Sequence, residues 1–371
     1  MSQIVRVDIY TIVQQTPEYS WSPVMPDVLN TDTIIRLTDS HGFEGIGSVC
    51  TFTEYGVDKS VMESIRPLAI RLLRQKNPAP ETYWQEMTMR RPGVTNSAIA
   101  AIDFALWDLE AKKQNMPLHK LLGGTKTSIP AYASVPILNN PAEYVDLISK
   151  LKRSGFSIFK FHYKSEAEAD IALIEAVCDA HGHDCQFMFD AENLYGQKEA
   201  EQVAGYMLSR DFIWLEAPFD DHDWKAYHML SQKTPVQIIP AGNSVVDNSH
   251  ITQAIEANCW DAIRIDATSA GGITPALQIF DQSLSAGLNV ECQSWGSSIS
   301  TAANLHLALA KQNSHYFEIP VPREDFLVPG TSQLELTMSG EIIAPNAEGI
   351  GISVDWPVIE KHSTHHMSYT S

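Results

Sequence analysis

Residues 184–219, DCQFMFDAENLYGQKEAEQVAGYMLSRDFIWLEAPF, contain two short apolar segments separated by one amphipathic segment. The apolar segments QFMF and FIWL have the length and composition of buried strands, and each is followed by an acid, Asp190 or Glu216. The segment between them repeats apolar residues at helical spacing. A strand, a helix and a second strand in this order predict a βαβ unit with parallel strands.

This unit repeats from Ser128 to Pro320. Eight strand-like segments occur there, separated by helix-like segments: 128–134, 156–164, 184–192, 212–219, 236–243, 261–268, 289–295 and 315–320. Strands that alternate with helices indicate an α/β fold, and eight of them indicate a closed barrel of the TIM type. In such barrels the active-site residues sit at the carboxyl ends of the strands.

The N-terminal sequence predicts a separate, smaller unit. Residues 4–13 and 31–49 alternate between apolar and polar positions, and DSHG at 39–42 is typical of a hairpin turn. Helical periodicity then follows and is clearest at 97–114. Strands followed by helices predict an α+β domain.

The chain therefore divides into three predicted segments. Residues 1–125 form the α+β domain and residues 126–320 form the barrel. Residues 321–371 return to hairpin-like alternation and should complete the first domain. The last ten residues, 362–371, are expected to be a loose tail.

The composition excludes several classes of function. Twenty-six Lys and Arg against 45 Asp and Glu give a net charge of −19, which would repel nucleic acids and acidic membranes. Five cysteines, an odd number without CxxC spacing, favour a reduced cytoplasmic compartment. Without a basic stretch followed by a long apolar one, we expect neither a signal peptide nor a membrane span.

Polar residues occupy matching positions near the strand ends. Because strand side chains alternate between two faces, one face of each strand points into the barrel. A single acidic residue is more often a surface residue or part of an ion pair. Polar residues at the inward positions of many successive strands instead favour a functional site. Seven inward positions are 30, 26, 27, 23, 27 and 25 residues apart, as one βα repeat requires: Lys160, Asp190, Glu216, Asn243, Asp266, Gln293 and Glu318.

Asp190, Glu216 and Asn243 come from three adjacent strands and offer oxygen ligands at one side of the barrel mouth. Hard oxygen ligands suit Mg²⁺, which leaves coordination positions for water and substrate. Buried carboxylates without a cation or hydrogen-bonding partners would be costly. We therefore predict that these three residues bind Mg²⁺.

Further motifs occur at SAIAAIDFALWDLEAKKQNMPLHKLLGG (97–124), FMFDAEN (187–193), WLEAPF (214–219), DATSAGGIT (266–274), QSWGS (293–297) and EGIGISVDW (348–356). In this order they resemble the enolase superfamily, in the subgroup of mandelate racemase and muconate lactonizing enzyme. The resemblance covers nearly the whole chain. It implies a capping domain over a modified (β/α)7β barrel, with Mg²⁺ at the ends of the third, fourth and fifth strands. It also implies removal of the proton α to a substrate carboxylate, giving an enediolate that the metal stabilises.

Three residues depart from the family pattern. Asn243 stands where the family has an acid, so the site carries one negative charge fewer. His162 replaces the catalytic lysine of a Lys-x-Lys motif, and the neighbouring lysines should keep it neutral and able to accept a proton. Gln293 replaces the histidine of a His-Asp dyad and leaves Asp266 with no imidazole to orient. Racemisation needs proton-transfer groups on both faces of the carbanion, so these changes favour a one-face reaction.

The predicted reaction is dehydration of an acid sugar or similar hydroxy acid to a 2-keto-3-deoxy product. His162 would remove the α proton, and Glu192 would help the β-hydroxyl leave as water. An equal alternative is that Glu192 hydrogen-bonds a substrate hydroxyl or pairs with Lys164. Lys160 would neutralise the substrate carboxylate. Further candidates for substrate contact are Lys164, Trp295 and Glu318, of which Glu318 would need a proton to contact a carboxylate.

Two other functions stay open. One is cycloisomerisation or epimerisation through the same intermediate, and the other is a catalytically silent relative that binds a small acid. The expected ligand is a small carboxylate, with substrate choice set by cap loops near 19–25 and 50–55. The resemblance also implies a homo-oligomer, either a dimer or an octamer.

Overall fold

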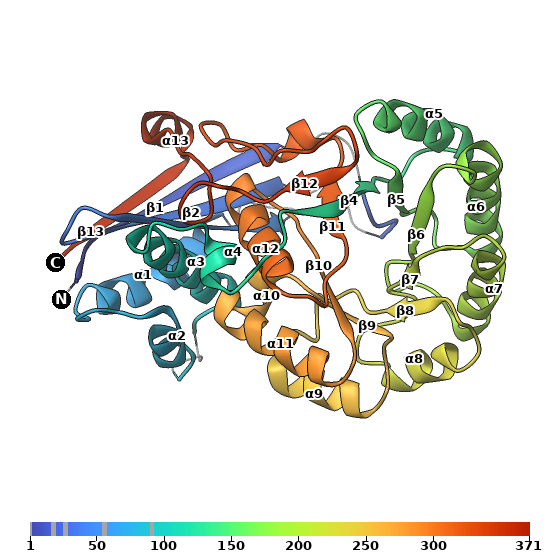
Figure 1. The fold of residues 1–371 in the computed structure, drawn as a ribbon, viewed down its shortest axis with the longest axis horizontal. Coiled ribbons are helices and arrows are strands. Elements are labelled where there is room, and N and C mark those ends of the chain that lie inside the picture. The colour runs from blue at the N-terminus through green and yellow to red at the C-terminus, as the bar shows by residue number, and fades with distance from the viewer. Residues whose placement is uncertain (1, 16–19, 25–28, 54–57, 90–92) are drawn as a thin grey trace.

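The computed structural model describes every residue except 1, 16–19, 25–28, 54–57 and 90–92. Eight parallel strands form a nearly closed barrel surrounded by helices, and an antiparallel sheet with its own helices packs against it (Figure 1). The predicted α/β fold, a (β/α)7β barrel with an α+β cap, is confirmed.

The barrel strands neighbour one another in the order β8-β7-β6-β5-β4-β11-β10-β9. Between β8 and β9 the ring closes where the backbone N–H of Asp261 donates to the carbonyl of Ile238 at 3.0 Å. All eight strands occur where the sequence predicts them. They are β4 (Ser128–Val135), β5 (Ile158–Phe161), β6 (Gln186–Asp190), β7 (Trp214–Glu216), β8 (Gln237–Ile239), β9 (Ala262–Ile265), β10 (Asn289–Cys292) and β11 (Phe317–Pro320).

Helices connect successive barrel strands and cover the outside of the ring (Figure 1). They are α5 (Pro141–Lys152), α6 (Ala167–His181), α7 (Gln197–Leu208), α8 (Trp224–Ser231), α9 (Asn248–Glu256), α10 (Ala267–Ala270), α11 (Ile273–Ser285) and α12 (Ser298–Ala310). Directly after β11 the chain forms a short 3-10 helix, η1 (Arg323–Phe326), in place of the longer helices that follow the other barrel strands.

The barrel interior is layered because side chains alternate in direction along each strand. The base is apolar and consists of Tyr132, Ile158, Met188, Trp214, Ile239 and Ala262. Two residues further along four of these strands, the inward positions carry charge: Lys160, Asp190, Glu216 and Arg264. Apolar packing therefore fills the base, and charged groups occupy the layer beneath the mouth.

The cap sheet has the strand order β13-β1-β2-β3 and is antiparallel throughout. Its strands are β1 (Ile4–Gln15), β2 (Leu29–Asp39), β3 (Glu44–Thr53) and β13 (His365–Thr370). Helices α1 (Asp58–Leu72), α2 (Pro80–Thr88), α3 (Asn96–Lys113) and α4 (Leu118–Leu121) lie between β3 and the barrel in the chain. The predicted turn at 39–42 joins β2 to β3.

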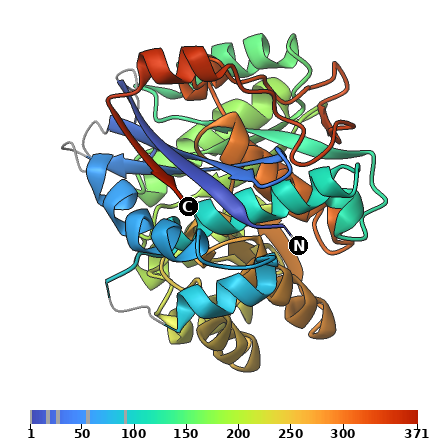
Figure 2. The same cartoon turned by 90° about the vertical axis from the view of Figure 1, so that its left-hand side faces the viewer.

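The C-terminal segment contributes to both units. β12 (Glu341–Ile343) pairs with β4 of the barrel, whereas α13 (Trp356–His362) leads into β13, which pairs with β1 of the cap. The expectation of a loose tail is wrong, because the backbone of His365–Thr370 forms a strand at the edge of the cap sheet. The two chain ends consequently lie close together (Figures 1 and 2). The domain limits at 125 and 320 stay a prediction.

Asp103 on α3 fixes the cap against the barrel. Its carboxylate is fully buried and accepts hydrogen bonds from the backbone N–H of Thr274 at 3.1 Å and from its hydroxyl at 2.6 Å. Burial raises the pKa of Asp103 to about 7. Gly272 has a φ of +128°, and a Cβ there would lie 2.4 Å from Asp103 Oδ2, so this close contact requires glycine.

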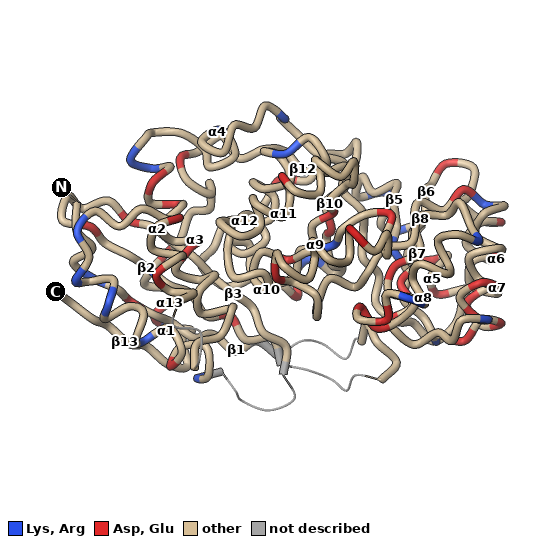
Figure 3. Tube along the Cα trace, turned by 90° about the horizontal axis from the view of Figure 1, so that it is seen from below, with Lys and Arg blue, Asp and Glu red and all other residues tan. Residues whose placement is uncertain are grey.

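The acidic excess is distributed over both the cap and the barrel (Figure 3). Within the described chain, no helix combines the length and the apolar character needed to cross a membrane.

His119 on α4 and His306 on α12 form a buried contact where the chain leaves the cap. The backbone N–H of His119 donates to His306 Nδ1 at 2.9 Å, so this nitrogen acts as an acceptor and carries no proton. Burial lowers the pKa of His119 to about 4 and that of His306 to about 3. Both rings are therefore neutral at pH 7 in the folded protein.

His306 should make the fold sensitive to acid. Below its ordinary pKa of 6.5, the unfolded chain binds a proton that the folded chain does not, so stability falls as the pH falls toward 3. The loss at pH 5 is about 2 kcal/mol. His306→Asn keeps a hydrogen-bond acceptor but does not titrate, so it should lose less unfolding free energy than wild type between pH 7 and pH 5 in urea titrations. His183→Asn, at an exposed histidine, is the control, and equal losses in wild type and His306→Asn would contradict the prediction.

Candidate active site

A cavity of about 30 Å³ lies at the carboxyl ends of the barrel strands. It is lined by Lys160, His162, Asp190, Glu192, Asn193, Glu216, Ala217, Ala241, Asn243, Gln293 and Trp295. Eight of these residues are candidates from the sequence. The other three candidates, Lys164, Asp266 and Glu318, lie outside this lining, and their roles stay predictions.

Lys160 on β5 stands at the centre of the charged layer. Its Nζ lies 3.1 Å from Asp190 Oδ2, 2.9 Å from Glu216 Oε1 and 3.0 Å from Glu318 Oε1. Burial and the nearby Arg264 oppose its charge, but the three carboxylates outweigh them and hold the pKa of Lys160 well above its ordinary value. The carboxylates thus converge on one position that already accommodates a cation.

Arg264 on β9 belongs to this cluster, and the sequence analysis missed it. Its Nε lies 2.6 Å from Glu216 Oε1, and its Nη2 lies 2.6 Å from Glu318 Oε2. Burial opposes ionisation of Glu318, but Arg264 and Lys160 lower its pKa to about 2, so Glu318 is ionised. Arg264 precedes Asp266 by two residues, so the alternation that points Asp266 inward also points Arg264 inward. The alternation of inward and outward side chains along β9 could therefore have identified Arg264 from the sequence.

The predicted metal ligands Asp190 and Glu216 face each other across neighbouring strands β6 and β7. Asp190 Oδ1 accepts the backbone N–H of Glu192 at 3.0 Å, and Glu216 Oε2 accepts the indole N–H of Trp214 at 3.1 Å. Burial opposes ionisation of both carboxyl groups. At Asp190, Lys160 and His162 outweigh burial and lower the pKa. At Glu216, burial prevails and raises the pKa to about 7. Two converging carboxylates and the nearby amide of Asn243 are a donor set that fits Mg²⁺.

Asn243 is positioned by Asp221, which the sequence analysis also missed. The buried carboxylate of Asp221 accepts backbone N–H groups from Ala241 at 2.8 Å and from Asn243 and Ser244 at 3.2 Å each. The loop after β8 is therefore folded around one side chain. No periodic pattern marks Asp221, because it lies in the loop after β7.

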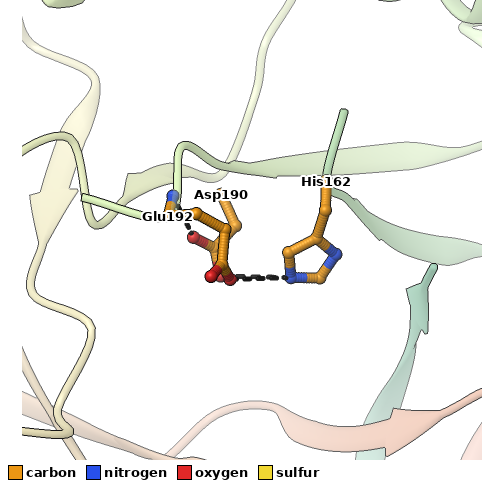
Figure 4. A group of neighbouring side chains, drawn as sticks. All are labelled: His162, Asp190 and Glu192. Atoms are coloured by element: carbon orange, nitrogen blue, oxygen red, sulfur yellow. Dashed lines mark hydrogen bonds and ion pairs between the residues drawn. The ribbon is translucent and has the colours of Figure 1, made fainter. Parts of the chain in front are cut away.

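His162 follows β5 and directs one nitrogen toward the acids (Figure 4). Its Nδ1 lies 2.8 Å from the carbonyl oxygen of Val135, which can only accept, so Nδ1 carries a proton and donates it. Its Nε2 lies 3.2 Å from Asp190 Oδ2 and 3.8 Å from Glu192 Oε1. The expected lysine surroundings are not found: carboxylates face Nε2, and Lys164 is exposed with its Nζ 5.4 Å from the Tyr163 ring centre.

Glu192 lies beside His162, and one atom from each of His162, Asp190 and Glu192 falls within 4.8 Å of the others. Burial, and then the charge of Asp190, raises the pKa of Glu192 to about 8. The sequence predicts the direction of this shift, although burial is the larger cause. Glu192 adopts a φ of +53°, an uncommon conformation that turns its side chain at the end of β6. A protonated carboxyl therefore stands next to an imidazole.

The opposite side of the cavity carries Gln293. Its backbone N–H donates to the carbonyl of Ile265 at 2.7 Å, which fixes the chain after β10. Asp266 caps α10 instead of meeting Gln293: its Oδ1 accepts the Thr268 N–H at 2.7 Å and the Asn304 amide at 2.9 Å. An amide does not exchange protons as an acid or base, so the described lining offers no such group on this side.

Known proteins share this fold and sequence pattern. Residues 28–123 match the family described as mandelate racemase / muconate lactonizing enzyme, N-terminal domain, and residues 143–358 match the family described as enolase C-terminal domain-like. A solved structure assigned to the mandelate racemase/muconate lactonizing enzymes, from Pseudovibrio sp., covers 100% of both chains with a TM-score of 0.93 and 32% identity.

Two curated relatives catalyse different reactions. L-talarate/galactarate dehydratase of Salmonella typhimurium is 29% identical over 257 residues, which are 67% of this chain and 64% of that enzyme. A solved structure of that dehydratase is liganded with Mg and L-lyxarohydroxamate. Hydrophobic dipeptide epimerase of Enterococcus faecalis is 26% identical over 259 residues, which are 69% of this chain and 73% of that enzyme.

The two family matches together extend over both units of the fold. Dehydratases, epimerases and a cycloisomerase occur among the relatives at similar identity, so the comparisons fix the family and leave the reaction open. The chain belongs to the enolase superfamily, in the group of mandelate racemase and muconate lactonizing enzyme.

Proposed function

We propose that this chain is a Mg²⁺-dependent dehydratase of a hydroxy acid. The observation that carries the proposal is the distance of 3.8 Å between His162 Nε2 and Glu192 Oε1, which sets a base and an acid on one side of the cavity. Gln293 on the other side cannot relay protons, which disfavours racemisation. The dehydratases among the relatives support this choice, and the epimerases make a discriminating experiment necessary.

Asp190, Glu216 and Asn243 would hold the metal. When bound, Mg²⁺ would stabilise the negative charge that develops on the substrate carboxylate as the α proton leaves. Lys160 brings a second positive charge to the same position, 2.9 Å from Glu216 Oε1, and would neutralise the substrate carboxylate.

Elimination then needs two proton transfers. His162 Nε2 takes the proton from the α carbon, while the Val135 carbonyl holds the Nδ1 proton and so fixes the ring. Glu192 gives its proton to the β-hydroxyl as the carbon–oxygen bond breaks, and water leaves. The resulting enol rearranges to a 2-keto-3-deoxy acid. Because both groups lie on one side, the α proton and the hydroxyl should leave from the same face.

His162→Asn should lower turnover by about 10²–10⁴-fold, the usual effect of removing a general base. The asparagine amide can still donate to the Val135 carbonyl, so the fold should be retained. The assay is formation of 2-keto-3-deoxy product from a panel of hydroxy acids with Mg²⁺, with the thermal midpoint as the folding control. Near-normal turnover would place the base elsewhere.

Glu192→Gln should separate the two proton transfers. The variant keeps His162 and should still exchange the substrate α proton in D₂O, whereas water elimination should fall about 10²–10⁴-fold. Mass and stereochemistry of recovered substrate are measured by mass spectrometry and NMR. Glu175→Gln, at an exposed position of α6, is the control. Deuterated substrate of inverted configuration from wild type would indicate epimerisation instead.

Asn243→Asp should tighten Mg²⁺ binding about 10-fold or more, because it adds a negative charge directly to the ligand set. Asn193→Asp adds the same charge at another residue of the cavity lining and is the matched control. Calorimetric titration of Mg²⁺ into each protein gives the dissociation constants. Equal tightening in both variants would show that Asn243 acts by charge alone and does not ligate the metal.

A further inference from the structure

Two buried polar atoms at the cavity lack partners. Among the described residues, neither Gln293 Oε1 nor Trp295 Nε1 has a hydrogen-bond partner, although both side chains line the cavity. A buried acceptor or donor without a partner costs free energy that a ligand can recover by supplying the missing group. One atom accepts and the other donates, and both are uncharged. This side of the cavity is therefore suited to the hydroxyl groups of a ligand.

Trp295 is held in a cluster of aromatic rings. Its ring lies edge-on to Trp21 at 4.8 Å between centroids, to Phe326 at 5.6 Å and to Phe52 at 5.9 Å. Trp21 and Phe52 come from the cap, and Phe326 from η1, so three separate segments support the ring. This packing fixes the position of the indole ring and of its N–H donor at the cavity.

The cations that line the cavity lie on the other side, and Arg264 of β9, outside the lining, is already paired with Glu216 and Glu318. Of the described residues that line the cavity, only Lys160 and His162 can be cationic, and the Lys160 ammonium already contacts three carboxylates. The described cap segments that reach Trp295, residues 20–24 and 50–52, contain neither Lys nor Arg.

We infer that Gln293 and Trp295 select a monocarboxylic polyhydroxy acid, an aldonate, and reject the corresponding dicarboxylic aldarate. This inference rests on the proposed dehydratase function and narrows its substrate class. The single carboxylate lies on the side of Lys160 and the metal ligands. The uncharged hydroxylated end lies on the side of Gln293 and Trp295, where hydroxyl groups supply the missing donor and acceptor. A terminal carboxylate there could accept the Trp295 indole N–H, but it would leave the Gln293 carbonyl oxygen without a donor and would find no cation in the lining of this side.

Matched substrate pairs test the selection. Aldonates and aldarates of the same configuration, such as gluconate with glucarate and galactonate with galactarate, differ only at the terminal carbon. Their kcat/KM values with the wild-type enzyme and Mg²⁺, and their dissociation constants with His162→Asn, should favour the aldonate at least 10-fold. Preference for aldarates, equal affinity for both or binding of neither would overturn the inference. Selective aldonate binding without turnover or α-proton exchange would support the inference and count against the dehydratase function.

Trp295→Phe tests the donor atom while keeping an aromatic ring. It should raise KM for aldonates roughly 3- to 10-fold, because one hydrogen bond to the substrate is lost. The kcat should stay within about twofold of the wild-type value. Trp260→Phe is the control, because it also removes a buried indole N–H that has no partner among the described residues. Trp260 lies just before β9, at the opposite end of the barrel, so this variant should leave KM unchanged. An unchanged KM in Trp295→Phe, with wild-type thermal stability, would exclude the indole as a substrate donor.

Discussion

Five charged side chains at the barrel axis form one network of ion pairs, and the site depends on this cluster. Lys160 and Arg264 bring two formal positive charges to the three carboxylates of Asp190, Glu216 and Glu318. Charges buried as deeply as these are tolerated only when they are paired and hydrogen-bonded. One formal negative charge remains, which makes the layer receptive to a further cation. The apolar base below it excludes water and strengthens each of these interactions.

The two reactive side chains lie closer to the barrel mouth than the charged cluster. His162 and Glu192 lie two residues beyond Lys160 and Asp190, just past the ends of β5 and β6, so the spacing that builds the charged layer also brings them to the mouth. Each is then fixed by the backbone: His162 by the Val135 carbonyl, and Glu192 by a left-handed conformation directly after the strand. The scaffold therefore orients base and acid before any ligand binds, as efficient proton transfer requires.

Much of this arrangement can be predicted from the sequence because it follows from strand periodicity. The βα repeat located the eight strands, and the inward phase found eight of the residues that line the cavity. The same phase extends to Arg264, which occupies on β9 the position that Lys160 occupies on β5. Periodicity fails where the backbone leaves the strand: it pointed Lys164 inward, although that side chain is exposed, and it gave no signal for Asp221. The C-terminal strand β13 was missed because its six residues become a strand only by pairing with β1, more than 350 positions away.

The cavity of about 30 Å³ has room for an ion or a water molecule but not for a sugar acid. A substrate would therefore need more room than the present lining leaves, and the rings packed around Trp295 support one wall of that lining. If these rings shift to admit the substrate, association would be slower than collision alone allows. The same rings, packed again around the bound molecule, would hold the enol until it has rearranged.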